Sequence, residues 1–278
     1  MSDLEVRKEQ IRKRISRASN LPTLPGVVAR VIEIVDDPST TGRQLGEELA
    51  KDQVLCAKIL KLVNSGFYGF SKPISTVSHA VTMLGFDAAK SLVLSSSVLE
   101  QMEAALPGLW GHSLACARTC VMIAERAQLP DSEELGVIGL LHDIGKVVLF
   151  QSLENDFHRI RLRIDKKEML FSEAEEEVMG FNHGALGGWF LEEWTLPPQL
   201  VEPIIDHHDF RPRREHAQRT AVVHLADILC RAEGLGNGGD ARIPRLEPEA
   251  LGVLDLDLDS IGALMGDMHR DLAHLRSS

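Results

Sequence analysis

Histidine and aspartate side chains are the residues of this 278-residue chain best suited to chemistry. A histidine–aspartate pair, with a lysine one turn later, lies in the apolar stretch Gly139-Leu140-Leu141-His142-Asp143-Ile144-Gly145-Lys146. The other candidates follow a similar pattern over the second half of the chain: His112, His183, the doublet His207-His208, and Asp227. Imidazole and carboxylate groups bind divalent metals, and seven donors suffice for one or two ions.

Each of these residues also has a plainer interpretation. A single histidine beside apolar residues is more often a core or surface side chain than a ligand. Asp143 and Asp227, however, each lie in an apolar helical segment, where a carboxylate needs a compensating charge or hydrogen bonds. A divalent cation held by imidazoles would compensate both. We therefore predict a metal site that contains His112, His142, Asp143, His183, His207, His208 and Asp227.

The elements that must position these side chains are helices. Apolar residues recur at spacings of three and four, and no strand-like alternation lasts long enough to compete. Ser172 with Glu175 fits a capping box, and Asn182 is a candidate cap for the helix that starts at His183. In the second half we expect helices over 109–128, 133–151, 154–167, 173–179, 183–194, 198–209 and 217–233, and an amphipathic helix from Ser260.

The predicted fold is therefore all-α, a multi-helix bundle. The first half reads as short helices separated by breakers such as Leu21-Pro22-Thr23-Leu24-Pro25-Gly26. The predicted segments are a basic N-terminal helix (1–19), an N-terminal helical half (20–105), a metal-binding half (106–232), and a Gly-rich loop with a C-terminal amphipathic helix (233–278).

The N-terminal segment 1–17 carries six basic and three acidic residues. It could be a basic arm for an acidic partner, but a solvated helix with the thin apolar stripe Leu4, Ile11 and Ile15 is the favoured interpretation.

Composition excludes several classes of protein. The net charge of −11 and the 5% aromatic content argue against general nucleic-acid binding. Four scattered cysteines form no disulfide framework, which favours a reducing compartment. No apolar signal core or run of about 18 apolar residues is seen, so we expect a cytoplasmic protein without a membrane helix.

The order His112, His142-Asp143, Asp227 resembles the four-ligand pattern of the HD superfamily of metal-dependent phosphohydrolases. His183 and His207-His208 resemble the second-metal ligands of its HD-GYP phosphodiesterase branch. The chain departs from that branch after the doublet, where no Gly-Tyr-Pro follows, which argues against cyclic-dinucleotide cleavage. Gly108 stands where some members supply an extra acidic ligand, which argues against a third metal.

The chain more closely resembles the HDOD family of bacterial signalling proteins, over roughly residues 20 to 232. The resemblance implies an all-helical fold, a regulatory role and, with the donor types, one or two divalent ions, with iron or manganese favoured and magnesium, nickel or zinc as alternatives. Many members lack ligands, whereas this chain has them. The resemblance rests on Leu21-Pro22-Thr23-Leu24-Pro25, the Asp52 helix with Leu60-Lys61-Leu62-Val63-Asn64-Ser65, Ile74-Ser75, Ala80-Val81, Leu84-Gly85, His142-Asp143-Ile144-Gly145-Lys146, His183 with Gly187 and Leu191, Trp194 with Leu196-Pro197, and His207-His208.

Within that resemblance, Asp143 would bridge two ions about 4 Å apart. One ion would be held by His112, His142 and Asp227, and the other by His183, His207 and His208. Lys146 is a candidate catalytic residue beside Asp143, for a phosphate oxygen, although a surface cation is an equal alternative. A solvated loop is the favoured interpretation of Arg211, Arg213 and Arg214 over attraction of an anionic substrate. Neutral imidazole is required, so occupancy should fall below about pH 6.

Three other patterns have simpler explanations. Asp255 to Asp259 imitates a calcium loop but lacks its glycine and glutamate. Ser75 to Leu99 could pass for a DNA-reading helix-turn-helix, but its second helix offers only Lys90 as a cation. Cys116 and Cys120 could be soft-metal ligands, but core packing explains them better.

The sequence thus predicts a regulatory protein of bacterial signal transduction, with signalling proteins as partners. The alternative is a phosphohydrolase or phosphodiesterase that takes a phosphoester or a nucleotide. The two hypotheses differ in whether a coordination position faces a cleft, because a catalytic metal needs one and a structural metal does not.

Overall fold

The computed structural model describes residues 3–17, 40–41, 44–45, 63, 74, 76, 79–81, 102–193 and 196–272. The chain forms two compact units, one of residues 1–21 with 101–278 and one of residues 22–100. Most of the helices predicted between residues 27 and 99, the Ser75–Leu99 pair and Trp194 lie outside the described residues. In the second unit, Thr41 caps a turn, since its hydroxyl oxygen accepts from the N–H of Gln44 at 3.4 Å.

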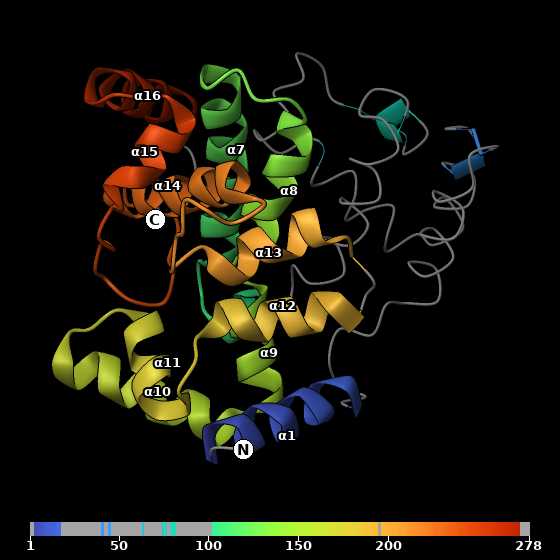
Figure 1. The fold of residues 1–278 in the computed structure, drawn as a ribbon, viewed down its shortest axis with the longest axis vertical. Coiled ribbons are helices and arrows are strands. Elements are labelled where there is room, and N and C mark those ends of the chain that lie inside the picture. Colours follow the sequence, from blue (N-terminus) through green and yellow to red (C-terminus); the bar gives the residue numbers. More distant parts are fainter. Residues whose placement is uncertain are drawn as a thin grey trace. The chain divides into compact units, whose positions relative to one another are not determined.

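The first unit is built from helices, and the described residues contain no β-strand (Figure 1). The all-α prediction is confirmed. The helices are α1 (Asp3–Arg17), α7 (Leu109–Arg126), α8 (Ser132–Leu141), α9 (Ile144–Ser152), α10 (Glu154–Lys167), α11 (Phe171–Met179), α12 (His183–Glu193), α13 (Pro198–Asp206), α14 (Ala217–Ala232), α15 (Pro248–Leu254) and α16 (Leu258–Asp271).

Helices α7, α8 and α14 pack against one another, and α12 lies between α9 and α13 (Figure 1). Their apolar faces are continuous, and Ile123, Leu149, Leu186 and Leu225 are each fully buried. The segment Glu134–Ser152 has the length and mean hydropathy, 1.3, of a membrane span, but 89% of its apolar window is buried within the structure. Helix α16 contacts α7 at the outside of this unit.

The expected helix over 133–151 is wrong in one respect, because the structure has two helices there. Leu141 ends α8, His142 and Asp143 form a turn, and Ile144 begins α9. The backbone of Asp143 departs from helical geometry, with φ −96° and ψ 7°. Adjacent residues of a continuous helix point about 100° apart, so this interruption is what allows two neighbouring side chains to face one centre.

Of the two predicted helix-start signals, one is wrong and one agrees with the structure. Ser172 and Glu175 do not form the capping box of α11. Glu173 accepts a hydrogen bond from the N–H of Leu170, the N-cap residue, at 3.0 Å, and Leu170 has no side-chain acceptor to complete a capping box. The Asn182 prediction agrees with the structure, since Asn182 Oδ1 accepts from the N–H of Gly184 at 3.0 Å. The false calcium loop is explained by capping, because Asp257 Oδ1 accepts from Ser260 N at 2.8 Å.

The N-terminal helix is not a free arm. The apolar stripe of α1 is docked, with Ile11 7% and Ile15 3% exposed, against α12 and α9. Arg7 donates to the carbonyl of Val178 at 2.9 Å and to Asp156 at 3.1 Å. Leu4, the third residue of the predicted stripe, is 37% exposed, so the docked part of the stripe is Ile11 and Ile15 and most of the rest of the helix faces solvent, as the favoured interpretation expects.

Helices α9 and α12 cross with their backbones in direct contact. A Cβ added to Gly145 of α9 would stand 1.9 Å from the carbonyl oxygen of His183 and 2.8 Å from the amide nitrogen of Gly187. Only glycine permits the backbones of α9 and α12 to touch there. The contact places the beginning of α9, next to Asp143, against the beginning of α12, at His183.

Candidate metal centre

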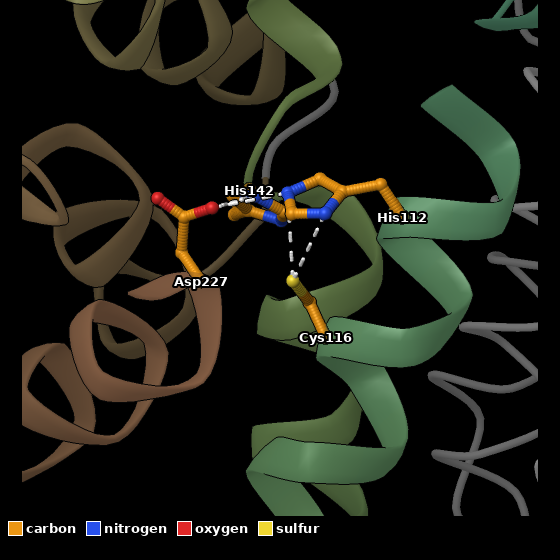
Figure 2. A group of neighbouring side chains, drawn as sticks. All are labelled: His112, Cys116, His142 and Asp227. Atoms are coloured by element: carbon orange, nitrogen blue, oxygen red, sulfur yellow. Dashed lines mark hydrogen bonds and ion pairs between the residues drawn. The ribbon is translucent and has the colours of Figure 1, made fainter. Parts of the chain in front are cut away.

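The structure brings all seven predicted ligands into one cluster in the first unit. His112 lies on α7, His142 and Asp143 in the turn between α8 and α9, His183 at the start of α12, His207 and His208 after α13, and Asp227 on α14. All are buried except His208, which is partly exposed. His112, His142 and Asp227 converge from separate segments, with Cys116 on the same side (Figure 2).

The donors form overlapping groups that could hold an ion, and one of them, His142 with Asp143 and His207, connects the two groups defined next. We define the first ligand group as His112, His142 and Asp227, and the second ligand group as His183, His207 and His208. Within each group, one ligand atom per residue lies within 4.8 Å of the others. In the first, His112 Nε2 is 3.0 Å from Asp227 Oδ1, and in the second, His183 Nε2 is 3.0 Å from His208 Nε2.

Asp143 divides its two oxygens between the two groups. Oδ2 lies 3.4 Å from His142 Nε2 and 3.7 Å from His112 Nε2. Oδ1 lies 3.0 Å from His183 Nε2. A carboxylate with one oxygen toward each group has the arrangement of a bridge between two metals.

The unbonded imidazole nitrogens fit a cation. His142 Nδ1 is 2.7 Å from the carbonyl oxygen of Gly139, and His207 Nδ1 is 2.7 Å from that of Ile204. A carbonyl only accepts, so each Nδ1 carries the proton and each Nε2 presents a lone pair to the centre. Both Nε2 atoms are buried and lack a hydrogen-bond partner among the described residues.

A histidine of the same core shows the contrasting case. His224, 4% exposed, has both ring nitrogens engaged. Its Nδ1 is 2.8 Å from the carbonyl oxygen of His207, and its Nε2 accepts from the N–H of Glu247 at 3.2 Å. A structural histidine of this protein is thus satisfied on both sides, whereas His142 and His207 are satisfied on one.

The electrostatics of the cluster also favour bound cations. Burial alone would raise the pKa of Asp143, but His142 and Lys146 outweigh it and hold that pKa well below the usual range. Burial, Arg231 and His112 have the same net effect on Asp227. Burial, reinforced by neighbouring imidazoles, places the pKa values of His207 and His208 well below the ordinary value. Ionised carboxylates beside neutral imidazoles form the protonation state that metal binding needs.

His183 differs from the other imidazoles because a carboxylate supports it from behind. Glu175, fully buried on α11, accepts from the ring at 2.6 Å and from the N–H of His183 at 2.9 Å, both through Oε2. Burial lowers the pKa of His183, but Glu175 outweighs it and the pKa is raised. A carboxylate behind a ligating histidine fixes its tautomer and makes it a more basic ligand.

Lys146 is completely buried and is not a surface cation. Its ammonium donates to Asp143 Oδ2 and to the carbonyl of Gly238, both at 2.7 Å. The face of Phe171 lies 5.3 Å from the nitrogen. In this arrangement Lys146 compensates the charge of Asp143.

Cys116 is near the first ligand group but is poorly placed to join it. Its Sγ lies 3.6 Å from Nε2 and 3.9 Å from Nδ1 of His112. A donor that shared an ion with Nε2 would lie on the lone-pair side of that atom, much farther from Nδ1. Burial and the neighbouring Cys230 raise the pKa of the thiol, which favours its protonated form. The geometry therefore favours core packing, as predicted for Cys116 (Figure 2).

The comparisons with known proteins agree with this architecture. The model of the HDOD domain matches residues 21–210, which is most of the chain. The chain belongs to the HDOD family. A crystal structure of an HDOD domain protein of unknown function from Geobacter sulfurreducens is 27% identical, with a TM-score of 0.79, and the match covers 99% of this chain and 97% of that one.

Two further structures share the HDOD fold. A protein from Shewanella amazonensis SB2B, provisionally named a phosphohydrolase, is 20% identical, with a TM-score of 0.71 and coverage of 96% and 98%. A protein from Marinobacter aquaeolei VT8, provisionally named a signal transduction protein, is 18% identical, with a TM-score of 0.76 and coverage of 99% and 65%. The chain spans 43% of the length of the curated relative that it matches, a Treponema pallidum protein 22% identical to it.

The HDOD resemblance predicted from the sequence is therefore confirmed, and the residues form groups able to hold a divalent metal. The matched HDOD region ends at residue 210, before Asp227. Sequence reasoning missed the residues behind the ligands: Glu175, Arg231 and Asp240. Arg231 could be found from its place four residues after Asp227 on an apolar helix, but Asp240 lies in a loop with no periodic pattern.

Proposed function

We propose that this HDOD chain is a regulatory protein of bacterial signal transduction that binds two divalent cations in an enclosed centre. The observation that carries the proposal is the division of Asp143 between two complete ligand groups. The donors come from separate segments of the fold, so bound cations would tie α7, α12, α14 and the two intervening turns together. Signalling proteins would then read the surface of a unit whose shape depends on metal.

Enclosure favours this regulatory role over catalysis. His112, His142, Asp143, His183, His207 and Asp227 are each at most 2% exposed. Lys146, the candidate cation for a substrate phosphate, instead donates to Asp143 and to the carbonyl of Gly238. Arg211 is exposed and paired with Asp209, and Arg214 is 3.6 Å from Asp206, which supports the solvated-loop interpretation of that segment.

A phosphohydrolase is the second candidate, and a specific observation favours it. Two ligand groups that share a carboxylate are the arrangement of two-metal hydrolases, in which the ions polarise a phosphoryl oxygen and supply a hydroxide nucleophile. His208, the partly exposed ligand, marks the side from which a phosphoester or nucleotide would approach. The provisional name of the Shewanella protein points the same way, at an identity that supports only the fold.

Imidazole and carboxylate donors suit iron and manganese, with magnesium, nickel and zinc as alternatives. The test is elemental analysis of the chain, purified without chelator or affinity nickel, together with hydrolysis of bis(p-nitrophenyl) phosphate. We expect close to two equivalents of metal and no turnover above that of Asp143→Ala. That variant should lose metal under either function, because it removes the proposed bridge.

The outcomes separate the candidates. Turnover that Asp143→Ala abolishes would make the chain a phosphodiesterase. Absence of metal from protein reconstituted with iron or manganese would overturn both candidates. Asp255→Asn is the matched control, since Asp255 is an exposed aspartate outside the cluster and should keep the metal content of the unaltered chain.

A further inference from the structure

The Gly-rich segment of residues 234–242, here called the strap, touches the groups that support the metal ligands. The carbonyl oxygen of Leu235 lies 3.3 Å from His112 Nδ1. The carbonyl of Gly238 accepts from Lys146, the same ammonium that donates to Asp143. Two main-chain carbonyls of the strap therefore contact the metal centre. One faces the ligand His112, and the other binds Lys146, which neutralises the charge of the ligand Asp143.

A buried ion-pair chain makes the third connection. Arg231 Nε donates to Asp227 Oδ1 at 2.9 Å, and its Nη1 donates to Asp240 of the strap at 3.0 and 3.1 Å. The side chains of Arg231 and Asp240 are 6% and 1% exposed. Asp240 Oδ2 also accepts from the N–H of Phe171 at 2.9 Å, at the start of α11.

The strap fits against α7 without room for a side chain. Gly236 has φ +67°, and a Cβ there would stand 2.0 Å from the amide nitrogen of His112. Asn237 fixes the strap to the residues before α7, since it donates from its N–H to Gly108 at 3.0 Å and from Nδ2 to Pro107 at 3.1 Å. The strap also borders a cavity of about 1020 Å³, whose lining includes His112, Arg161 of α10 and Glu168, the residue after that helix.

We propose that the strap is the outer support of the first ligand group, with Arg231 and Asp240 as positioning residues that hold the carboxylate of Asp227 toward the metal. The inference rests on the proposed function, because it requires the centre to bind metal. It adds that the affinity of the first ligand group is set by a segment beyond the matched HDOD region, and that metal bound there orders the strap.

Stability alone is a weak reason for this arrangement. Burial of an arginine between two aspartates carries a desolvation penalty that the attraction only partly offsets. The arrangement is better suited to orientation, because a guanidinium holds two carboxylates in fixed geometry. Groups behind a metal ligand typically change its affinity about 10–100-fold.

The test is Asp240→Asn, studied by Co²⁺ titration with visible absorption and calorimetry. The amide oxygen can still accept from Phe171, but the NH2 group that replaces Oδ1 cannot accept from Arg231 or from the N–H of Arg242. The variant therefore removes the charge and one of the two acceptors that face Arg231. We expect one of the two Co²⁺ equivalents to bind about 10–100-fold more weakly and the other to bind as before. Asp240→Glu should restore part of the loss. Asp255→Asn, an exposed aspartate in the same left-handed conformation that asparagine accepts, is the matched control.

A second variant separates positioning from general stability. Leu264→Ala removes a buried side chain of α16 that packs outside the centre, and it should lower the melting temperature without changing either Co²⁺ affinity. Equal weakening of both equivalents by Asp240→Asn, or unchanged affinities, would overturn the inference. If the unaltered chain binds no Co²⁺, the proposed function fails first.

Hydrogen exchange of the unaltered chain gives a test independent of any variant. We expect amides of residues 234–242 to exchange more slowly when Co²⁺ is added, and those of α16 to keep their rates. Equal rates in the strap with and without two bound equivalents would contradict the inference.

Discussion

The two ligand groups of the metal centre are similar in composition but differ in how they are supported. In the second group, support comes from nearby in the sequence: Glu175 lies eight residues before His183, and Ile204 three before His207. In the first group, the carbonyl that orients His112 belongs to Leu235, 123 residues away, and His112 meets Asp227 across 115 residues. His142, three residues after its carbonyl partner, is the locally supported member of the first group.

This difference indicates how each group forms. Local hydrogen bonds can orient the second group once α11, α12 and α13 are in place. The first group requires α7, α14 and the strap to be packed together, so its geometry depends on the completed fold. We therefore expect the first group to respond more strongly to distant changes and the second to respond to neighbours.

The largest expected effect comes from removing one ligand from each group. His112→Ala should lose the ion of the first group and His183→Ala that of the second, so that each variant retains about one equivalent. Elemental analysis after gel filtration measures the remainder. His158→Ala is the control, because His158 is an exposed histidine of α10. If either variant lost both ions, the two groups would be one cooperative site and the comparison would fail.

A smaller effect should follow from Glu175→Gln. The amide can still accept from His183 but carries no charge, so the imidazole becomes a less basic ligand. We expect the second group to lose about tenfold in affinity and the first to keep its own. Calorimetric titration with Mn²⁺ measures both constants.

Glu176→Gln is the matched control for that variant. Glu176 is the exposed neighbour on α11, and its carboxylate accepts from Asn182 at 3.1 Å, which an amide oxygen also can do. Weakening of the first group by Glu175→Gln would show that the supports are shared rather than separate.

The smallest expected difference between the two groups is the pH at which each releases its ion. Glu175 raises the pKa of His183, whereas burial lowers that of His112. Protons compete with metal at a ligand as the pH falls through its pKa, so they compete for His183 at a higher pH than for His112. On stepwise dialysis from pH 7.5 to about 5, the ion of the second group should leave first. Simultaneous release, or release in the reverse order, would contradict this assignment.

The residue pattern was sufficient to predict the all-α fold and most helices of the first unit, and the seven predicted donors lie close together in the structure. Apolar spacing on α10 survives in the structure because that helix buries one face, with Phe157, Ile160 and Ile164 inward. Helices α7 and α14 are instead buried on nearly every side along most of their length. The ends were predicted less well. Helix α13 ends at Asp206 rather than 209, and the doublet His207-His208 lies in the turn that follows. Helix α15 was not expected, since its seven residues are too few for a periodic pattern.

The supports behind the donors could not be predicted, because tertiary contacts define them. The interruption at His142-Asp143 lies in a strongly helical, apolar sequence, and only the packing of α8, α9 and α12 forces the turn. Lys146 was expected to meet a phosphate or solvent, yet the strap buries it. Arg231 and Asp240 come together through a loop whose sequence has no periodic pattern from which their contact could be predicted.

The direct backbone contact between α9 and α12 at Gly145 affects which relatives can be expected to bind metal. Counting ligands is the usual criterion, but it is incomplete for this fold. One methyl group at residue 145 would wedge α9 from α12 and separate the segments that bear Asp143 and His183, with every ligand still present in the sequence. A relative that keeps all seven donors but has a larger residue at position 145 is therefore expected not to form the metal centre. The presence of glycine at this position should be checked together with the presence of the ligands.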